Sequence, residues 1–486
     1  MPRCILKIID QTNVKFDGLD PVMRHKMSDA LKFMIPSAIH MPKFKLGRWD
    51  GKISFCTAGG ATYFNLLDRL LPILEENNYQ IDIDDRRPSY NFVFPVVDAD
   101  YFSMHTWPKG HDLEGEPIVL QDHQVKAIGT FLDNLQSLQE ISTGAGKTII
   151  TAVLSSIVQS YGRSIVIVPS KSLVLQTEED YKNVWLDVGV FFGDRKEWNH
   201  KHTICTWQSL SIFAKNTRNG DAEIPLEEFI KDVICVMVDE THTAKGHELK
   251  SLLTGSFAHI PIRWGMTGTV PKEDHESMCL YASIGPMVGS VSAKELQDKG
   301  FLANCRVEAY QLNDDHVSFT DYDSEHDFCL YDEERIKYVS ELIITLSESG
   351  NTVVLVDRVD AGKALQKLIP NSVFIYGVMK VIKRQVEYKS LSETENKVII
   401  ATYGVASVGI NAPRIFNLVL FEAGKAFIRT IQSIGRGLRK AKDKDFVRII
   451  DLCSSLKYSK RHLTERKKYY GAAEYPFVMK KVVYKA

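Results

Sequence analysis

The spacing of hydrophobic residues divides the chain into an N-terminal part and two longer blocks. After about residue 112, short runs rich in β-branched residues alternate with segments of helical length, and these runs occupy residues 164–168, 234–238, 352–356, 397–401 and 418–421. Continuous apolar runs of this kind are typical of strands buried on both faces of a parallel sheet. The pattern therefore predicts two α/β blocks, residues 112–295 and 300–486, each with a parallel sheet flanked by helices.

The first 105 residues have a different pattern. Two short apolar runs, 4–9 and 53–56, are followed by leucines at helical spacing, which are Leu66, Leu67, Leu70, Leu71 and Leu74. We expect a small α+β domain over residues 1–105, joined to the rest by a linker at 101–117, where Pro and Gly recur. We also expect this domain to be separable, so that its deletion leaves the two blocks folded.

The chain has 486 residues, a length that corresponds to about three domains. Its composition also indicates the cellular setting. Sixty Lys and Arg against 61 Asp and Glu give a formal charge of −1, so a surface for nucleic acid would have to be local. Eight scattered cysteines without a CxxC pair favour free thiols in a reducing compartment over a zinc ribbon. Because no apolar run suits a membrane span or a signal peptide, we expect a cytoplasmic protein with no membrane partner.

The strongest local signal is the segment STGAGKT at residues 142–148, which precedes a helical pattern. Its small residues, which would let successive backbone N–H groups face a phosphate, are Thr143, Gly144, Ala145 and Gly146. Lys147 would reach the β- and γ-phosphates, and the Thr148 hydroxyl would bind Mg²⁺. The segment predicts a phosphate-binding loop, although Ile141 stands where the common pattern has its first glycine.

A second signal follows about ninety residues later, where the apolar run 233–238 ends in Asp239, Glu240, Thr241 and His242. Asp239 would help to anchor the Mg²⁺ held by Thr148. The neighbouring Glu240 would orient and deprotonate the attacking water. Together with the phosphate loop, this pair of carboxylates predicts hydrolysis of a nucleoside triphosphate.

The two signals resemble motifs of the superfamily 2 helicases, and further motifs resemble that family in the expected order. The resemblance implies two RecA-like domains with ATP and Mg²⁺ in the cleft between them. It implies nucleotide contacts at Gln124 and Gly409. It implies contacts to the nucleic-acid backbone at Pro169, Lys171, Thr206, Gln208 and Thr402. It also implies catalytic roles for Lys147, Asp239, Glu240, His242, Gln432, Arg436 and Arg439.

Three of these motifs carry additional expectations. Arg436 and Arg439 would stabilise the charge that develops on the transferred phosphoryl group, an effect worth roughly 10³–10⁵ in rate in related enzymes. The segment 267–269, Thr-Gly-Thr, resembles the motif that links hydrolysis to strand binding. Asn411 stands where many relatives carry Asp, which bears on a ribose contact.

The most distinctive part of the N-terminal domain is the segment 44–53, FKLGRWDGKI. Lys45, Arg48 and Trp49 combine positive charge with an aromatic ring, a composition that suits a phosphate backbone and a stacked base. A β-hairpin with a core tryptophan is the alternative interpretation. The segment also resembles one near the start of the UvsW-like helicases of T-even phages, which act on branched DNA in a manner akin to RecG.

This second resemblance implies a DNA helicase that unwinds and branch-migrates forks, D-loops and four-way junctions in replication, recombination and repair. It implies a monomer acting on branched or single-stranded DNA, with recombination and single-strand-binding proteins of a phage or its host as partners, in the host cytoplasm. The motifs leave open an RNA helicase, a duplex translocase that does not unwind, and an ATP-bound clamp without significant turnover.

Two charged segments remain. Residues 439–486 hold 14 Lys and Arg against 5 Asp and Glu, a local excess that suits nucleic acid or simply a solvated helix. Residues 313–334 hold nine acidic residues and no Lys or Arg. We expect this acidic stretch to be a solvated insertion or a loop entering the second block.

Overall fold

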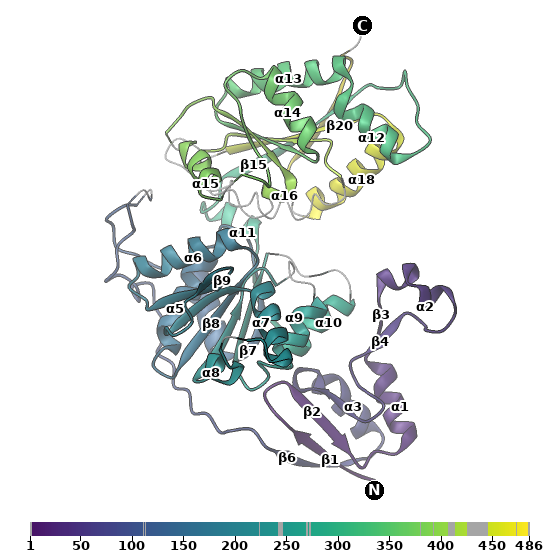
Figure 1. Cartoon of the computed structure of the whole chain (residues 1–486), viewed down its shortest axis with the longest axis vertical. Coiled ribbons are helices and arrows are strands. Elements are labelled where there is room, and N and C mark those ends of the chain that lie inside the picture. Colours follow the sequence, from purple (N-terminus) through teal and green to yellow (C-terminus); the bar gives the residue numbers. More distant parts are fainter. Residues whose placement is uncertain are drawn as a thin grey trace. The chain divides into compact units, whose positions relative to one another are not determined.

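The structure, a computed structural model, describes residues 2–109, 111, 113–222, 224–241, 246–268, 271, 274–379, 381–391, 393–406, 414–424, 446–472 and 474–484. Two compact units are formed (Figure 1). The first comprises residues 1–141 and 146–290, and the second comprises residues 291–486 with Ser142–Ala145.

A four-stranded sheet in the order β5-β2-β1-β6 forms the centre of the N-terminal module. Its strands are β1 (Arg3–Ile8), β2 (Asn13–Asp17), β5 (Ala61–Tyr63) and β6 (Gln80–Asp85). Helices α1 (Pro21–Ala30) and α3 (Leu67–Glu76) pack against it. Alternate residues of β1, Cys4, Leu6 and Ile8, are buried, as expected where one face of a sheet is covered. The predicted α+β character is confirmed.

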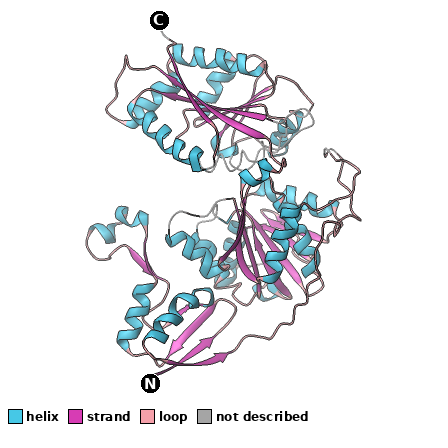
Figure 2. Ribbon diagram, turned by 180° about the vertical axis from the view of Figure 1, so that it is seen from behind, coloured by secondary structure: helices cyan, strands magenta, loops and turns pink. Residues whose placement is uncertain are grey.

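An arm leaves this module between α1 and β5 (Figures 1 and 2). Its base is a two-stranded antiparallel sheet of β3 (Lys32–Met34) and β4 (Lys52–Ser54). Between these strands the chain forms the 3₁₀ helix η1 (Pro36–His40) and the short helix α2 (Pro42–Lys45). Proline begins both helices, because its fixed φ suits the first helical position.

The rest of the first unit is built on an eight-stranded sheet in the order β10-β9-β11-β8-β12-β13-β7-β14. The strands are β7 (Gln136–Ile141), β8 (Arg163–Val168), β9 (Val188–Phe192), β10 (Arg195–Lys196), β11 (His202–Thr206), β12 (Val233–Val238), β13 (Ile262–Thr267) and β14 (Met287–Val291). Neighbouring strands from β9 to β7 in this order run parallel, and β10 pairs antiparallel with β9. The predicted runs 164–168 and 234–238 are the buried strands β8 and β12.

Helices cover both faces of this sheet (Figure 1). One group contains α4 (Asp122–Asp133), α5 (Lys147–Val158) and α6 (Lys171–Asn183), which pack side by side. The other contains α7 (Trp207–Asn219), α8 (Leu226–Ile230), α9 (Gly246–Leu253) and α10 (Asp274–Ser283). This is the layered arrangement that the alternation of strands and helices predicts.

The N-terminal module shares a core with this sheet domain. Met278 and Ala282 of α10 belong to the same cluster of buried side chains as Leu6 of β1. The backbone N–H of Gln11 also donates a hydrogen bond to the carbonyl oxygen of Ala258, at 3.1 Å. Removing the module would expose this apolar face of α10 and so lower the stability of the sheet domain. That the two blocks stay folded without the module remains a prediction.

A seven-stranded sheet in the order β17-β18-β16-β19-β20-β15-β21 forms the second unit. Its strands, all paired in parallel, are β15 (Asn304–Leu312), β16 (Thr352–Val356), β17 (Val373–Ile375), β18 (Val398–Thr402), β19 (Asn417–Phe421), β20 (Phe446–Ser454) and β21 (Phe477–Val482). The predicted runs 352–356, 397–401 and 418–421 correspond to β16, β18 and β19.

The helices of the second unit are α11 (Ala293–Asp298), α12 (Tyr322–Tyr331), α13 (Glu333–Ser347), α14 (Val359–Leu368), α15 (Val381–Ser390), α16 (Tyr403–Ala406) and α18 (Lys457–Ala472). Ile450 and Leu452 of β20 pack with α13 and α14, whereas Cys453 packs with Leu463 of α18. Because neighbouring residues of a strand point to opposite faces, helices cover both sides of this sheet too. The predicted pair of RecA-like domains after a small α+β domain is confirmed.

Six of the nine acidic residues in the stretch 313–334 are exposed, as its composition suggests, but two others are buried. Asp314 is fully buried, and Glu325 is 2% exposed. The Glu325 carboxylate accepts hydrogen bonds from the backbone N–H groups of Tyr458 and Ser459, each at 2.8 Å, at the start of α18. A carboxylate is favoured there by the unsatisfied N–H groups and the dipole of the helix. The acidic stretch thus anchors the basic tail helix.

Candidate nucleotide and nucleic-acid site

The candidate residues of the first unit follow neighbouring strands of its parallel sheet. In the order β11-β8-β12-β13-β7, each strand is followed by one of the motifs that the sequence singles out. Since parallel strands end at the same edge, these motifs lie along one edge of the sheet. The carboxyl edge of such sheets is where ligands bind in open α/β folds.

The predicted phosphate loop connects β7 to α5. Gly144 and Gly146 have φ values of 92° and 84°, in the left-handed region that favours glycine. Gly146 is the N-cap of α5, so the free N–H groups of that helix begin at the loop. A Cβ atom at Gly146 would lie 2.3 Å from Nε2 of Gln124, so a larger residue would displace that side chain from the loop. The geometry suits an anion at the helix N-terminus.

Gln124, the predicted adenine contact, is held against this loop by its own helix. It occupies the third position of α4, where its Oε1 accepts a hydrogen bond from the Gln121 backbone N–H at 2.9 Å. The two glutamines form a reciprocal capping box. Gln121 thus positions the Gln124 side chain, a role that the motif alone does not indicate.

The Lys147 side chain lies beside the carboxylates of the two residues that follow β12. This side chain is 7% exposed, and its ammonium pairs with Oε1 of Glu240 and lies 3.7 Å from Oδ1 of Asp239. The three predicted catalytic groups are thus brought together. Burial strengthens such pairing, because the local dielectric is lower than in water.

The backbone at the end of β12 positions the two carboxylates. The Asp239 N–H donates to the Ile167 carbonyl oxygen at 2.9 Å, which continues the pairing with β8. Glu240 has a φ of 51°, a conformation that non-glycine residues rarely adopt. Its Oε2 accepts a hydrogen bond from the Gly268 N–H at 3.3 Å. Gly268, in the predicted Thr-Gly-Thr motif, therefore contacts the carboxylate of Glu240 directly.

Thr148 and Asp239 are the residues proposed to hold Mg²⁺. They offer a hydroxyl and a carboxylate, hard oxygen donors that suit this ion. Within the described residues, no group of three or more His, Cys, Asp or Glu side chains could form a metal site of their own. Mg²⁺ is commonly held by one or two carboxylates and the phosphates of its nucleotide, so this donor set fits the ion.

The predicted backbone contacts of the first unit occupy the starts of two helices. Pro169 precedes α6 and Lys171 begins it, with the Lys171 side chain exposed. Thr206 caps α7, since its hydroxyl accepts from the Ser209 N–H at 3.3 Å. Its side chain is buried, whereas Gln208, two residues later, is exposed. Lys171 and Gln208 are therefore accessible, and Thr206 has a capping role.

In the second unit, Thr402 ends β18 and is largely buried. His242, Gly409, Gln432, Arg436 and Arg439 lie outside the described residues, as do Thr269 and Asn411. In the N-terminal module, Lys45 and Arg48 are exposed on the arm. Trp49 is half-buried, and its Nε1 donates to the Lys52 carbonyl oxygen at 2.8 Å. Trp49 stabilises the loop of the arm, so the alternative of a core tryptophan is wrong.

Two families of known proteins match the two sheet domains. The family described as "Type III restriction enzyme, res subunit" matches residues 117–272, and the helicase conserved C-terminal domain matches residues 334–441. The chain is a superfamily 2 helicase. Like other ATP-dependent helicases, it has two RecA-like domains in tandem.

Three proteins illustrate the relationship. The ATP-dependent DNA helicase UvsW of enterobacteria phage T4 is 24% identical over 484 residues, which cover 95% of this helicase and 92% of the phage protein. The DNA 3'-5' translocase XPB2 of Sulfurisphaera tokodaii is 26% identical over 208 residues, 42% of each chain. A fragment of a putative HsdR subunit of a type I restriction enzyme from Vibrio vulnificus shares the fold, with a TM-score of 0.56 at 16% identity over 74% of this chain and 67% of that one.

Among the described residues, no helix combines the length and the apolar character needed to cross a membrane.

Proposed function

We propose that the protein is an ATP-dependent DNA helicase that unwinds and branch-migrates forks, D-loops and four-way junctions in replication, recombination and repair. The observation that carries the proposal is that Lys147, Asp239 and Glu240 lie together at the end of β12. The Gly268 N–H also donates a hydrogen bond to the Glu240 carboxylate. The match to a phage DNA helicase along nearly the whole chain supports DNA as the substrate.

In the proposed mechanism, ATP binds with its phosphates at the loop Thr143, Gly144, Ala145 and Gly146, where the start of α5 offers free N–H groups. Gln124 contacts the adenine, and Lys147 balances the charge of the β- and γ-phosphates. Thr148 and Asp239 would hold Mg²⁺, which supplies charge neutralisation at the phosphate oxygens when bound.

Hydrolysis needs a base beside the attacking water. Glu240 is the proposed base, because its carboxylate is fixed by Lys147 on one oxygen and by the Gly268 N–H on the other. His242, Gln432, Arg436, Arg439 and Gly409 remain proposals from their motifs. The two arginines would stabilise charge that develops in the transition state, which lowers the barrier without tightening ground-state binding.

The proposed contacts with the nucleic acid divide between the RecA-like domains and the N-terminal module. Lys171 and Gln208, together with Pro169 and Thr206 at the starts of the same two helices, would bind the sugar-phosphate chain. Thr402, at the end of β18 in the second unit, is proposed as a further contact. Such contacts position the enzyme but do not distinguish a junction from a simple strand. We propose that the arm, through Lys45, Arg48 and Trp49, supplies the contact with branched DNA.

The experiment is a panel of matched substrates. ATPase and strand separation would be measured on a fork, a four-way junction, a linear duplex, single-stranded DNA and RNA of equal nucleotide content, with Lys147→Ala as the inactive control. We expect the fork and the junction to give the highest kcat/KM and to be unwound. Equal stimulation by linear duplex without unwinding would indicate a translocase, and stimulation by RNA alone would indicate an RNA helicase.

An ATP-bound clamp is the remaining alternative. It predicts negligible steady-state turnover with every nucleic acid in the panel. For the cellular setting, we propose a cytoplasmic monomer that works with recombination and single-strand-binding proteins, which sedimentation and co-purification would test.

A further inference from the structure

The arm of the N-terminal module exposes apolar side chains that its sequence motif does not explain. Leu46 is 65% exposed, Ile39 is 49% exposed and Met41 is 39% exposed. Ile39 lies near the end of η1, Met41 lies between η1 and α2, and Leu46 lies at the end of α2. Three exposed apolar side chains thus lie close together along one short arm, and exposed apolar groups mark interaction sites when their surroundings are polar.

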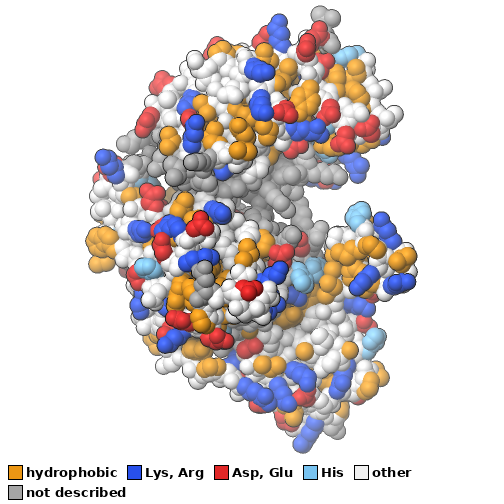
Figure 3. Space-filling view, viewed as in Figure 1, with side chains coloured by type: hydrophobic (Ala, Val, Ile, Leu, Met, Phe, Trp, Pro, Cys, Tyr) orange, Lys and Arg blue, Asp and Glu red, His pale blue; other side chains and the backbone are white. Residues whose placement is uncertain are grey.

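Positive charge surrounds this apolar tip (Figure 3). Residues 32–52 contain five Lys and Arg and a single acidic residue, Asp50. Asp50 pairs with Lys32 at 3.1 Å, at the base of the arm. No ion pair between described residues involves Lys43, Lys45 or Arg48, which are exposed near the tip. The charge of the tip therefore complements a polyanion such as the backbone of DNA.

The arm is ordered by its own contacts. The Ile35 N–H donates to the Gly51 carbonyl oxygen at 2.8 Å, and this bond closes the arm above its two strands. Ala38 is fully buried inside the arm. A Cβ atom at Gly51 would lie 2.8 Å from Cε of Met34 and 3.0 Å from Cδ2 of Phe44, so the interior has no spare room. The tip residues are therefore presented by a packed scaffold.

The base of the arm is fixed to the domain that carries the ATP site. Phe33 of β3 packs edge-on against Phe55, with ring centroids 5.9 Å apart. Phe55 in turn packs against His275 of α10, with ring centroids 5.8 Å apart. The Lys250 ammonium of α9 lies 4.7 Å from the centroid of the Phe55 ring. The base of the arm is thus packed against the motor domain, so that translocation would carry the tip along the DNA.

We propose that Ile39, Met41 and Leu46 form an apolar wedge that packs against the exposed base pair at a DNA branch point. Exposed apolar side chains insert between or against bases in many DNA-binding proteins, and this insertion costs unstacking energy. At a branch point the outer face of a base pair is already free, whereas within a linear duplex it must first be unstacked. The apolar tip would therefore select branched DNA, and Lys43, Lys45 and Arg48 would add affinity for any duplex.

This inference rests on the proposed function and adds a division of labour within the arm. Its test compares two variants, Met41→Gln/Leu46→Gln at the tip and Lys45→Ala/Arg48→Ala beside it. The matched control is Val22→Gln/Ile83→Gln, which replaces apolar side chains that are 79% and 68% exposed elsewhere in the same module. Thermal melts would verify folding, which exposed polar substitutions should preserve.

The readouts are the affinities for a fork and a linear duplex, and the fluorescence of 2-aminopurine placed at the branch point. For Met41→Gln/Leu46→Gln we expect the preference for the fork to fall about fivefold or more, given the energy of stacking one base. The fluorescence change on binding should disappear. For Lys45→Ala/Arg48→Ala we expect both affinities to fall together and the salt dependence to flatten by roughly 0.9 for each phosphate that is no longer neutralised.

Two results would overturn the wedge. One is an unchanged fork preference and fluorescence change in Met41→Gln/Leu46→Gln, which would leave the tip as a surface for a protein partner. The other is an equal loss of fork and duplex affinity in that variant. If the unmodified helicase itself had no preference for forks, the proposed function would fail first, so the two failures can be told apart.

Discussion

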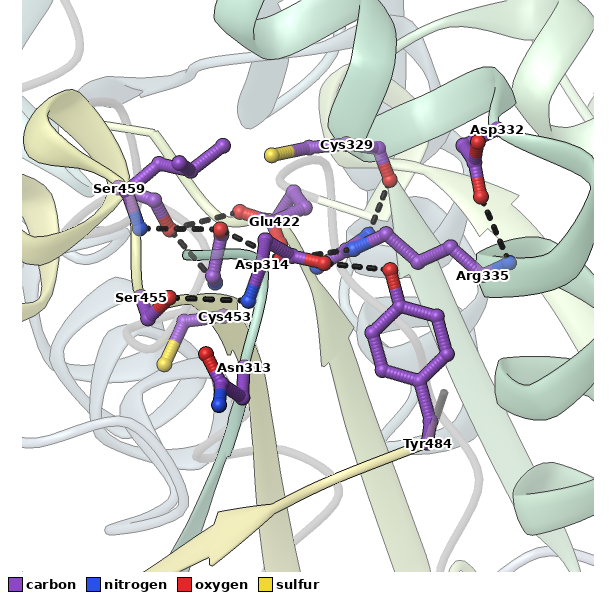
Figure 4. A network of polar contacts seen from close by, with 12 residues as sticks. Asn313, Asp314, Cys329, Asp332, Arg335, Glu422, Cys453, Ser455, Ser459 and Tyr484 are labelled. Atoms are coloured by element: carbon purple, nitrogen blue, oxygen red, sulfur yellow. Dashed lines mark hydrogen bonds and ion pairs between the residues drawn. The ribbon is translucent and has the colours of Figure 1, made fainter. Parts of the chain in front are cut away.

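Lys147 in the first unit and Arg335 in the second are both buried cations that lie against two carboxylates. Arg335 donates from Nε to Oδ2 of Asp314 at 3.3 Å and also pairs with Glu422 (Figure 4). Lys147 pairs with Glu240 and lies 3.7 Å from Asp239. In each cluster a glutamate with positive φ follows a buried parallel strand, Glu240 at 51° and Glu422 at 46°. Charge, burial and backbone strain are therefore alike.

The two clusters differ in how their carboxylates are held. Asp314 also accepts from the Ser454 hydroxyl at 2.6 Å, and Glu422 accepts from the Ser459 hydroxyl at 2.9 Å. These partners join α13, α18 and the ends of β15, β19 and β20 into one saturated network. A saturated buried network specifies the fold.

The cluster at Lys147 is more open. Both of its carboxylates come from the end of a single strand, and the Asp239 side chain is 15% exposed. The Lys147 ammonium has three donors, which could be shared with phosphate oxygens without separating any helices. Strain at a glutamate thus does not identify a functional site by itself; accessibility and the number of joined elements distinguish the two clusters.

The largest effect is expected at Glu240. Glu240→Gln should lower ATP hydrolysis about 10²–10⁴-fold, the usual contribution of a general base. Mg·ATP and DNA binding should persist, because the amide keeps the shape and the Gly268 contact. Asp239→Asn is the matched variant one residue earlier, and it should weaken Mg²⁺-dependent nucleotide binding instead. Single-turnover hydrolysis and nucleotide titration would separate the two roles, and equally poor Mg·ATP binding in both would contradict the assignment.

Arg335→Leu should be the most destabilising change in the saturated cluster. Removing one partner of a buried ion pair leaves Asp314 and Glu422 without compensation, at a cost of about 3–5 kcal/mol in the free energy of unfolding. Urea denaturation would measure it, with Lys363→Ala in an exposed pair with Asp360 as the control. A double variant that adds Glu422→Gln should recover part of the loss. A change in Arg335→Leu as small as that of the control would refute the structural role.

Lys147→Ala should impair ATP hydrolysis more than stability, whereas Arg335→Leu is expected to impair stability. We expect kcat to fall about 10²–10³-fold, as when one charge-stabilising donor is removed from an active site. The free energy of unfolding should change less than in Arg335→Leu, because the two carboxylates can turn toward solvent. Steady-state ATPase with fork DNA and urea denaturation would be compared in the same preparation. A kcat within twofold of the unmodified enzyme would remove Lys147 from the site.

The sequence predicts the open cluster and not the saturated one, for a physical reason. The phosphate loop and the Asp-Glu pair are short segments whose residue types and spacing are required by phosphate chemistry, and each follows an apolar strand. Arg335, Asp314 and Glu422 come from three distant segments and have no spacing in common, so only the folded chain brings them together. The two buried carboxylates of the acidic stretch could not be predicted for the same reason, because charge alone does not reveal which carboxylates are buried.

The arm is an intermediate case. Its basic and aromatic residues were visible in the sequence, but the apolar tip was not, because Ile39, Met41 and Leu46 follow neither a strand nor a helix period. Only their exposure in the structure distinguishes them from core residues.

The smallest effect is expected at Glu308, whose carboxylate is buried while its cationic partners are partly exposed. Burial alone would raise the pKa of Glu308, but hydrogen bonds from Lys480 and Arg306 outweigh it and lower the pKa to about 2. The usual pKa of 4.5 applies to the unfolded chain. The folded state therefore binds fewer protons between pH 4.5 and 2, and the stabilisation, present above this window, is lost as the pH falls through it.

Glu308→Gln removes this stabilisation at every pH. The difference in unfolding free energy between the unmodified enzyme and the variant therefore measures the interaction of the Glu308 carboxylate with its cationic partners. We expect a difference of about 1–2 kcal/mol at neutral pH, because solvent screens the partly exposed cations. It should shrink as the pH is lowered from 4.5 toward 2. Glu295→Gln, in an exposed pair with Lys299, is the control and should show a smaller difference at neutral pH. A Glu308 difference as large as that of Arg335→Leu would mean that burial of the carboxylate alone decides the strength of such a cluster, whatever the exposure of its cations.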